Sequence, residues 1–345
     1  MTDHDKLYRP MFCSAVAQAT ALIAVVLLCA TAGFGQTNPE AIRAALAEKP
    51  SVVKASWWGF NETESTKALQ AAIDSRVPRL IVDNMGAPWI TDRLRCVSDQ
   101  EIVFEQGTEV VAKRGSFKGT NDCLFTCRLQ KNVTLRGEGA VLRMWRSDYD
   151  GAEYQRAEWR HVLSILSSEN VKVYGLTLSE SGGDGIYLGS GQAGVTNKDI
   201  IISGVICDRN YRQGISVITA ENLLIEDTIL RDTAGTAPQA GIDFEPNRTT
   251  ERLVNCVMRN CTSERNKGGG YALYIPTLDS TSADATVRFE NCRSSDETYG
   301  TALYTGNTEK AAVLGSIEYV NCTFERSGGS AIIINDKPVG GLKLS

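Results

Sequence analysis

A short strand-like motif recurs along the sequence with a spacing of about 30 residues, and this repeat restricts the possible folds more than any other feature. The copies begin at Gly185, Gly214, Gly241, Tyr271, Thr301 and Ser330. An earlier copy, Val162–Ile165, precedes Gly185 by a somewhat shorter interval. Such a period predicts a solenoid, in which each coil packs only on its neighbours.

A second column repeats in step with the first. The pairs Asn260-Cys261, Asn291-Cys292 and Asn321-Cys322 recur with the same period, each directly after a short strand. Residue types that recur at one phase of every coil indicate parallel stacking, whereas a β-sandwich or propeller would show antiparallel hairpins with two-residue turns. We therefore expect an all-β, right-handed parallel β-helix over residues 79–345, with the asparagines hydrogen-bonded in a ladder. The in-line cysteines favour a small apolar stack over a metal site.

The first 78 residues differ from the repeats. Residues 1–36 have a basic start, an apolar run and small residues at its end, which is typical of a signal peptide; a transmembrane anchor is the alternative. Residues 37–78 form an expected cap region, in which 65–75 predicts an amphipathic helix with Thr63 or Ser65 as N-cap. Its apolar face comprises Ala68, Leu69, Ala72 and Ile73. Strands are expected at 79–83, 100–104 and 133–135.

Charge and cysteine content restrict the partners. The 345 residues carry a net charge of -5 and no long basic run, which argues against nucleic acid as a partner. An anionic polysaccharide would need a local basic patch or a bound cation. Eight of the ten cysteines follow residue 36. Export permits disulfides, and Cys123 and Cys127 are candidates for one.

The stretches Gly183-Asp184-Gly185-Ile186 and Ala240-Gly241-Ile242-Asp243-Phe244-Glu245, together with the helix-then-strand opening, resemble the pectate lyase-like superfamily of right-handed β-helix proteins. The resemblance covers about residues 60–340. It implies the fold, but its members include lyases, hydrolases, epimerases, tailspikes and adhesins, so it implies no single activity. The Gly-His-Gly and Asp-Pro-His arrangements of some members are absent, and His161 is the one histidine after the leader.

The coil alignment predicts a candidate catalytic cluster. Tyr187, Ser216 and Asp243 should point outward as one column, because they alternate with apolar residues. The expected cluster on this face comprises Asp184, Arg212, Asp243 and Glu245. Two steps along a strand would place Asp243 and Glu245 about 6.5–7 Å apart, near the spacing of acid and base in inverting glycosidases.

Six further residues are expected to bind substrate: Arg160, His161, Tyr187, Gln213, Tyr154 and Trp159. Arg160 aligns with Arg212, and His161 aligns with Asp184 and Gln213. Tyr154 and Trp159 lie in an insertion, residues 145–160, whose aromatic rings suit stacking on sugars. Each residue also has a structural interpretation: Asp184 as a turn former, His161 as a packed histidine, and the insertion as an Ω-loop that seals the sheet.

These features favour a carbohydrate-active enzyme that is secreted to the periplasm, the medium or the cell surface, with no stable membrane span after cleavage of the leader. The expected activity is that of a polysaccharide lyase or glycoside hydrolase on an extracellular polysaccharide, with uronic-acid-containing polysaccharides among the candidates. A non-catalytic glycan-binding or structural solenoid is the alternative, and it predicts binding without turnover. No cofactor is certain from the sequence, although clustered carboxylates would permit Ca²⁺.

Overall fold

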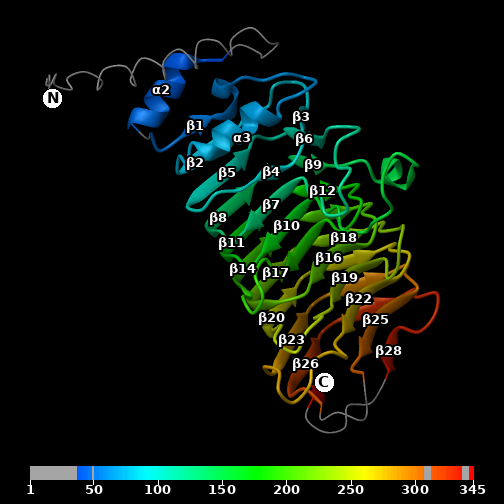
Figure 1. Ribbon diagram of the computed structural model, residues 1–345. Coiled ribbons are helices and arrows are strands. Elements are labelled where there is room, and N and C mark those ends of the chain that lie inside the picture. Colours follow the sequence, from blue (N-terminus) through cyan, green and yellow to red (C-terminus); the bar gives the residue numbers. More distant parts are fainter. Residues whose placement is uncertain (1–36, 49, 307–311, 336–341) are drawn as a thin grey trace, which may run out of the picture.

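A computed structural model of the chain describes residues 37–48, 50–306, 312–335 and 342–345. The expected signal peptide lies outside these residues. The described chain winds into a solenoid of three parallel sheets, one with 11 strands and two with nine. Successive coils follow one another from the N-terminal to the C-terminal end of the molecule (Figure 1). The predicted parallel β-solenoid is therefore confirmed.

The strands of each sheet come from the same phase of successive coils. The first sheet contains β1 (Val53–Lys54), β2 (Arg79–Val82), β5 (Gln100–Phe104), β8 (Lys131–Arg136), β11 (Glu169–Tyr174), β14 (Asn197–Ser203), β17 (Ala220–Glu226), β20 (Leu253–Arg259), β23 (Ala285–Glu290), β26 (Gly315–Val320) and β29 (Leu342–Leu344). The second sheet contains β3 (Trp89–Thr91), β6 (Glu109–Ala112), β9 (Val141–Arg143), β12 (Thr177–Ser179), β15 (Ile206–Asp208), β18 (Ile229–Arg231), β21 (Thr262–Glu264), β24 (Arg293–Ser295) and β27 (Thr323–Glu325). The third sheet contains β4 (Leu94–Arg95), β7 (Phe125–Arg128), β10 (Leu163–Leu166), β13 (Ile186–Gly189), β16 (Gln213–Val217), β19 (Ala240–Phe244), β22 (Gly269–Tyr274), β25 (Tyr299–Tyr304) and β28 (Ile332–Asn335).

The structure corrects the register of two repeats. Ile242 in β19 lies opposite Tyr271 in β22, so Gly241 does not align with Tyr271 as the sequence alignment has it. Thr301 lies opposite Ile332 rather than opposite Ser330. In the first case the observed register places Gly241 opposite Gly270, within a column of glycines at each of which a Cβ would lie 2.5–2.8 Å from a carbonyl oxygen of the next coil. The column comprises Gly185, Gly214, Gly241, Gly270 and Gly300.

Helices cover the N-terminal end of the solenoid (Figure 1). Helix α3 (Thr66–Asp74) is the predicted amphipathic helix, and its four predicted apolar residues are buried. Ser65 occupies the predicted N-cap position, but its hydroxyl donates to the carbonyl of Asn61 and caps no helical N–H; Glu64 accepts the N–H of Thr66 instead.

Two further elements of this end are additional to the predicted ones. They are helix α2 (Pro39–Glu48) and a 3₁₀-helix (Ala55–Trp58). Strand β1 pairs with β2, so the first sheet begins before residue 79.

The predicted asparagine ladder is confirmed. Asn291 Nδ2 donates to Asn260 Oδ1 at 3.2 Å, and Asn321 Nδ2 donates to Asn291 Oδ1 at 3.4 Å. All three residues adopt φ of 52–53°, a left-handed conformation that asparagine tolerates better than most residues. They therefore turn the chain as well as linking the coils.

The cysteines of the described chain are all free. Cys292 interacts with both Cys261 and Cys322, as the predicted stack requires. Cys123 and Cys127, the candidates for a disulfide, are not bonded to each other. Cys127 lies in β7 and packs in the apolar core, while the thiol of Cys123 donates to the carbonyl of Trp159. The two side chains therefore have separate structural roles.

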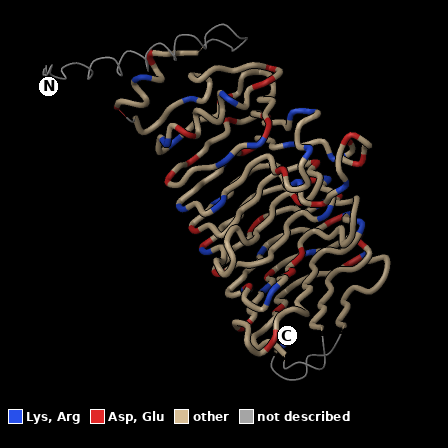
Figure 2. The backbone as a smooth tube through the Cα atoms, viewed as in Figure 1, with Lys and Arg blue, Asp and Glu red and all other residues tan. Residues whose placement is uncertain are grey.

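Charged side chains of both signs are interleaved along the coils rather than segregated to one face (Figure 2). Many form ion pairs between neighbouring coils, such as Arg259 with Glu226 and Arg265 with Asp232. Within the described residues, no helix is long and apolar enough to cross a membrane.

Candidate functional site

The predicted catalytic residues converge on the outer face of the third sheet, near β13, β16 and β19. Ser216 in β16 lies between Tyr187 in β13 and Asp243 in β19, so these outward residues form the expected column. Ile215 and Ile242, one residue earlier, face the core. The alternation of each strand thus positions the column.

Arg212 is the centre of the cluster. Its Nη2 lies 2.7 Å from Glu245 Oε2, and its Nε lies 3.8 Å from Glu158 Oε2. Its side chain is only 12% exposed. Burial alone would disfavour the charged guanidinium, but the neighbouring acidic groups, Asp184 first and then Glu245, outweigh this effect and raise the pKa of Arg212. The cation is therefore retained as a fixed positive charge.

Asp243 and Glu245 form a carboxyl pair. Asp243 is buried, and its Oδ2 accepts a hydrogen bond from Gln213 Nε2 at 3.1 Å. Burial and then the neighbouring carboxylate of Glu245 raise the pKa of Asp243 well above its ordinary value, against the opposing charge of Arg212. The two carboxyl groups share a side-chain hydrogen bond. The wider separation that the sequence predicts is therefore wrong for the carboxyl groups, because the rise along a strand fixes backbone positions and not the ends of side chains.

The accessible member of this pair is Glu245, whose side chain is 25% exposed. Asp243 lies beneath it, and its buried Oδ1 receives no hydrogen bond from an N–H or O–H group of the described residues. The pair therefore combines a buried carboxyl group with a raised pKa and one that reaches solvent beside Arg212. A carboxyl pair of this kind can act as a general acid toward a ligand that binds at the adjacent surface.

Asp184 lies deeper than predicted. It is fully buried, and neither carboxyl oxygen has a hydrogen-bond partner in the described structure. Its backbone N–H lies within hydrogen-bond distance of His161 Nδ1, at 2.9 Å. Asp184 Oδ2 lies 3.2 Å from the same Nδ1. The ring of His161 stacks on Tyr187 with the ring centroids 4.5 Å apart, so these three residues form one unit.

Three residues expected to bind substrate have other roles. Arg160 is fully buried and donates to the carbonyls of Phe117 and Gln155, so it fixes the insertion and does not face a ligand. Gln213 is also buried, and it positions Asp243. Tyr154 packs against Tyr149 and accepts the N–H of Gly115.

Trp159 is the exposed aromatic residue of the insertion, with 45% of its surface accessible. From the same segment comes Glu158, which the sequence does not single out. The Glu158 carboxylate lies 3.8 Å from Arg212. The coil alignment does not predict this contact, because loops do not follow the repeat.

A cavity of about 330 Å³ opens beside the cluster. Tyr187 belongs to both, since its hydroxyl experiences the charges of Glu251 in the cavity wall and of Asp184, Arg212 and Glu245 in the cluster. The remaining lining residues are Ser190, Gly191, Gln192, Ala193, Ile218, Asn247 and Arg248. The sequence predicts none of these, because they lie in the turns after β13, β16 and β19.

The carboxylate cluster does not suit Ca²⁺. The guanidinium of Arg212 already lies between Glu245 and Glu158, where a cation would need to be. The part of the chain that the structure describes contains no group of three or more His, Cys, Asp or Glu side chains able to hold a metal ion. The residues present therefore do not fit the Ca²⁺ that the sequence would permit.

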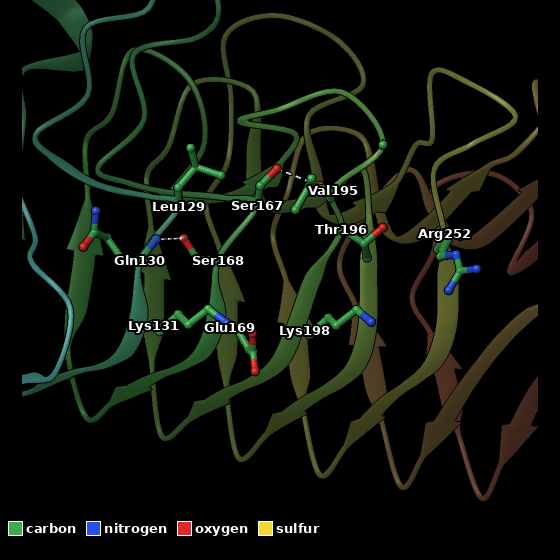
Figure 3. Close-up of a pocket in the computed structure, with 11 residues that line it drawn as sticks. Leu129, Gln130, Lys131, Ser167, Ser168, Glu169, Val195, Thr196, Lys198 and Arg252 are labelled. Carbon is green, nitrogen blue, oxygen red and sulfur yellow. Dashed lines mark hydrogen bonds and ion pairs between the residues drawn. The ribbon is translucent and has the colours of Figure 1, made fainter.

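A second hollow, of about 410 Å³, lies where the third sheet turns into the first (Figure 3). Lys131, Glu169 and Lys198 lie side by side along its lower edge, and Arg252 lies at one end (Figure 3). Lys131 pairs with Glu169, while Lys198 and Arg252 both pair with Glu221. Each of these cations therefore has a carboxylate partner, so the hollow has the character of an ion-pair ladder.

Comparisons with known proteins agree with this architecture. A family model described as a right handed beta helix region matches residues 161–339, just over half of the chain. No curated protein matches the sequence.

Several solved structures are similar in fold. An iota-carrageenase in complex with iota-carrageenan fragments superimposes with a TM-score of 0.54 at 15% identity, over 78% of this chain and 58% of that one. The tailspike of Acinetobacter baumannii bacteriophage Fri1, a capsular polysaccharide depolymerase, gives 0.56 at 12% identity, over 82% and 57%. The tailspike of E. coli bacteriophage HK620, in complex with a pentasaccharide, gives 0.57 at 12%, over 82% and 49%. The chain thus spans about half the length of these proteins, and the likeness extends to the fold alone.

Proposed function

Because this chain belongs to the right-handed β-helix family, whose fold displays side chains along an outer sheet, we propose that it hydrolyses glycosidic bonds of an extracellular polysaccharide at the cluster around Arg212. The observation that carries this proposal is the Asp243–Glu245 carboxyl pair, with its shared hydrogen bond, beside a fixed cation. The apolar leader over residues 1–36 supports a secreted location.

The chemistry requires a proton donor. As a glycosidic bond breaks, its oxygen takes up a proton and the water that adds to the anomeric carbon loses one. The raised pKa of Asp243 favours its protonated form, and this proton passes through Glu245 to the departing oxygen. Arg212 stabilises the negative charge left on the pair until the pair takes up the proton that the water loses, which restores the starting state.

Product analysis on a panel of polysaccharides tests the proposal. Hydrolysis creates reducing ends without unsaturated sugars, whereas a lyase would create an unsaturated uronate that absorbs in the ultraviolet. We expect Glu245→Gln to lower the rate by at least about 100-fold, the usual contribution of a general acid. Glu226→Gln, which alters a surface carboxylate of the first sheet, is the matched control and should cleave at the wild-type rate.

Two other outcomes would count against the proposed hydrolysis at this cluster. Full activity in both Glu245→Gln and Asp243→Asn would exclude this site. Glycan binding without new ends, across the whole panel, would support the non-catalytic alternative.

A further inference from the structure

The cavity next to the cluster has two walls that are held rigidly in place. One wall is the turn 190–193, where the N–H groups of Gly191 and Gln192 both donate to Ser167 Oγ, at 2.8 and 3.1 Å. The other wall is the turn 247–251, where Glu251 Oε2 accepts the N–H groups of Asn247 and Arg248. Both turns are fixed before any ligand binds, which lowers the entropic cost of binding.

The cavity lining is mostly polar, and Tyr187 and Ile218 contribute to its apolar part. Ile218 is almost fully buried, and the ring of Tyr187 lies over Gly189, where an added Cβ would be 2.1 Å from Tyr187 Cε1. Gly189 therefore leaves the space that the tyrosine ring fills. An aromatic ring with polar walls on either side suits one sugar ring, because sugars have an apolar face and polar edges.

One cation in this cavity has no side-chain partner among the residues that the structure describes. Arg212 pairs with Glu245 and Arg252 pairs with Glu221, but the guanidinium of Arg248 makes no ion pair or hydrogen bond with any described residue. It is exposed at the end of a rigid turn. The carboxylate of Glu251 points to the backbone of that same turn, so it positions Arg248 rather than neutralising it.

We infer that this cavity binds the sugar adjacent to the cleaved bond, and that Arg248 recognises an acidic substituent on that sugar, a carboxylate or a sulfate ester. A guanidinium donates two parallel hydrogen bonds to either group. The net charge of -5 repels polyanions as a whole, so an acidic glycan requires a local free cation such as this one. The inference rests on the proposed function for the identity of the neighbouring site, but its test needs no turnover.

Calorimetric titration with three oligosaccharides of equal length tests it: oligogalacturonate, which carries carboxylates, iota-carrageenan oligosaccharide, which carries sulfates, and a neutral galactan oligosaccharide. The full chain is titrated as wild type, Arg248→Gln, Arg248→Lys and the control Arg259→Gln on the first sheet. We expect the wild type to bind one of the two acidic probes at least roughly tenfold more tightly than the neutral one. The acidic probe that binds then identifies carboxylate or sulfate as the substituent.

Arg248→Gln should lose that preference, and Arg248→Lys should retain part of it, while the neutral probe and the control variant remain unchanged. Equal affinity of Arg248→Gln and wild type for the acidic probes, or no binding of either acidic probe, would overturn the inference. A loss of turnover in Glu245→Gln with the preference intact would separate this result from the test of the proposed function.

Discussion

Replacing Glu297 by glutamine is expected to remove a pH-dependent loss of stability from the interior of the solenoid. The Glu297 side chain lies in a polar pocket of the core and is only 4% exposed. Ser263 Oγ and Asn266 Nδ2 donate to its Oε1 at 2.7 and 2.6 Å, and Ser294 donates to Oε2. Burial raises the pKa of Glu297 from 4.5 to about 7, even though these three hydrogen bonds act in the opposite direction.

The sign follows from the proton balance of folding. Below about pH 4.5 both the folded and the unfolded chain hold the proton, so Glu297 has no effect on stability. Between this pH and about 7 the unfolded chain releases the proton while the folded chain keeps it, and the free energy of unfolding falls as the pH rises. The full loss is about 3 kcal/mol above pH 7, at about 1.4 kcal/mol for each pH unit between the two pKa values.

Urea unfolding of wild type and Glu297→Gln at about pH 4 and about pH 8 measures this loss. Glutamine keeps the acceptor for Ser263 and Asn266 and carries no charge, so the variant should gain about 3 kcal/mol relative to wild type between the two pH values. Other titrating groups are common to both proteins and cancel in the comparison. Glu226→Gln, at the surface, should shift by less than about 1 kcal/mol. A stability difference between wild type and Glu297→Gln that is the same at both pH values would refute the reasoning.

Three further substitutions test the packing of the coils and of the cavity. Gly241→Ala should cost at least about 2 kcal/mol in thermal unfolding, because the new Cβ would lie 2.8 Å from the carbonyl oxygen of Gly270. In the control Gly328→Ala the new Cβ meets only a carbonyl oxygen at 3.8 Å, so this variant should be nearly as stable as wild type. Similar melting temperatures for the two variants would contradict this reasoning. Gly189→Ala should displace the ring of Tyr187 and weaken oligosaccharide binding roughly tenfold, as measured by calorimetry. The circular dichroism spectrum should stay the same. Unaltered binding would show that the ring is not part of the binding cavity. Asn260→Ala should lower the free energy of unfolding in urea by about 2 kcal/mol, since it removes a ladder hydrogen bond and places alanine at a φ of 53°. Asn260→Gly should recover the part of this loss that comes from the backbone conformation, because glycine adopts a positive φ without strain.

The repeat explains why so much of the fold can be predicted. One period shared by two separate columns permits only stacked coils, and the alternation within each strand then assigns its inward and outward side chains. The alternation places Asp243 on the outer face, and the pairing of Ile215 with Ile242 agrees. The predicted register is wrong at Tyr271, because the alignment follows the similarity of apolar residues, whereas close contact of glycine with a carbonyl oxygen sets the true register.

The site is predictable only in outline. Alignment brings Arg212 near Asp243 and Glu245, because these residues lie in or directly beside the strands. It gives no information on Glu158 or Arg248, because loops follow no period. It also misassigns Arg160, whose alignment with Arg212 says nothing about the loop that buries it.

The sequence by itself therefore determined the coil, its asparagine ladder and the face on which the acidic residues gather, because these properties follow from periodicity. Tertiary structure alone decided which of those residues are buried, which share a proton and which cation remains free. Burial, carboxyl contact and the partners of a guanidinium depend on how loops from different coils close over the third sheet. The stacked repeat determines the fold, but it does not determine how these loops close over the sheet.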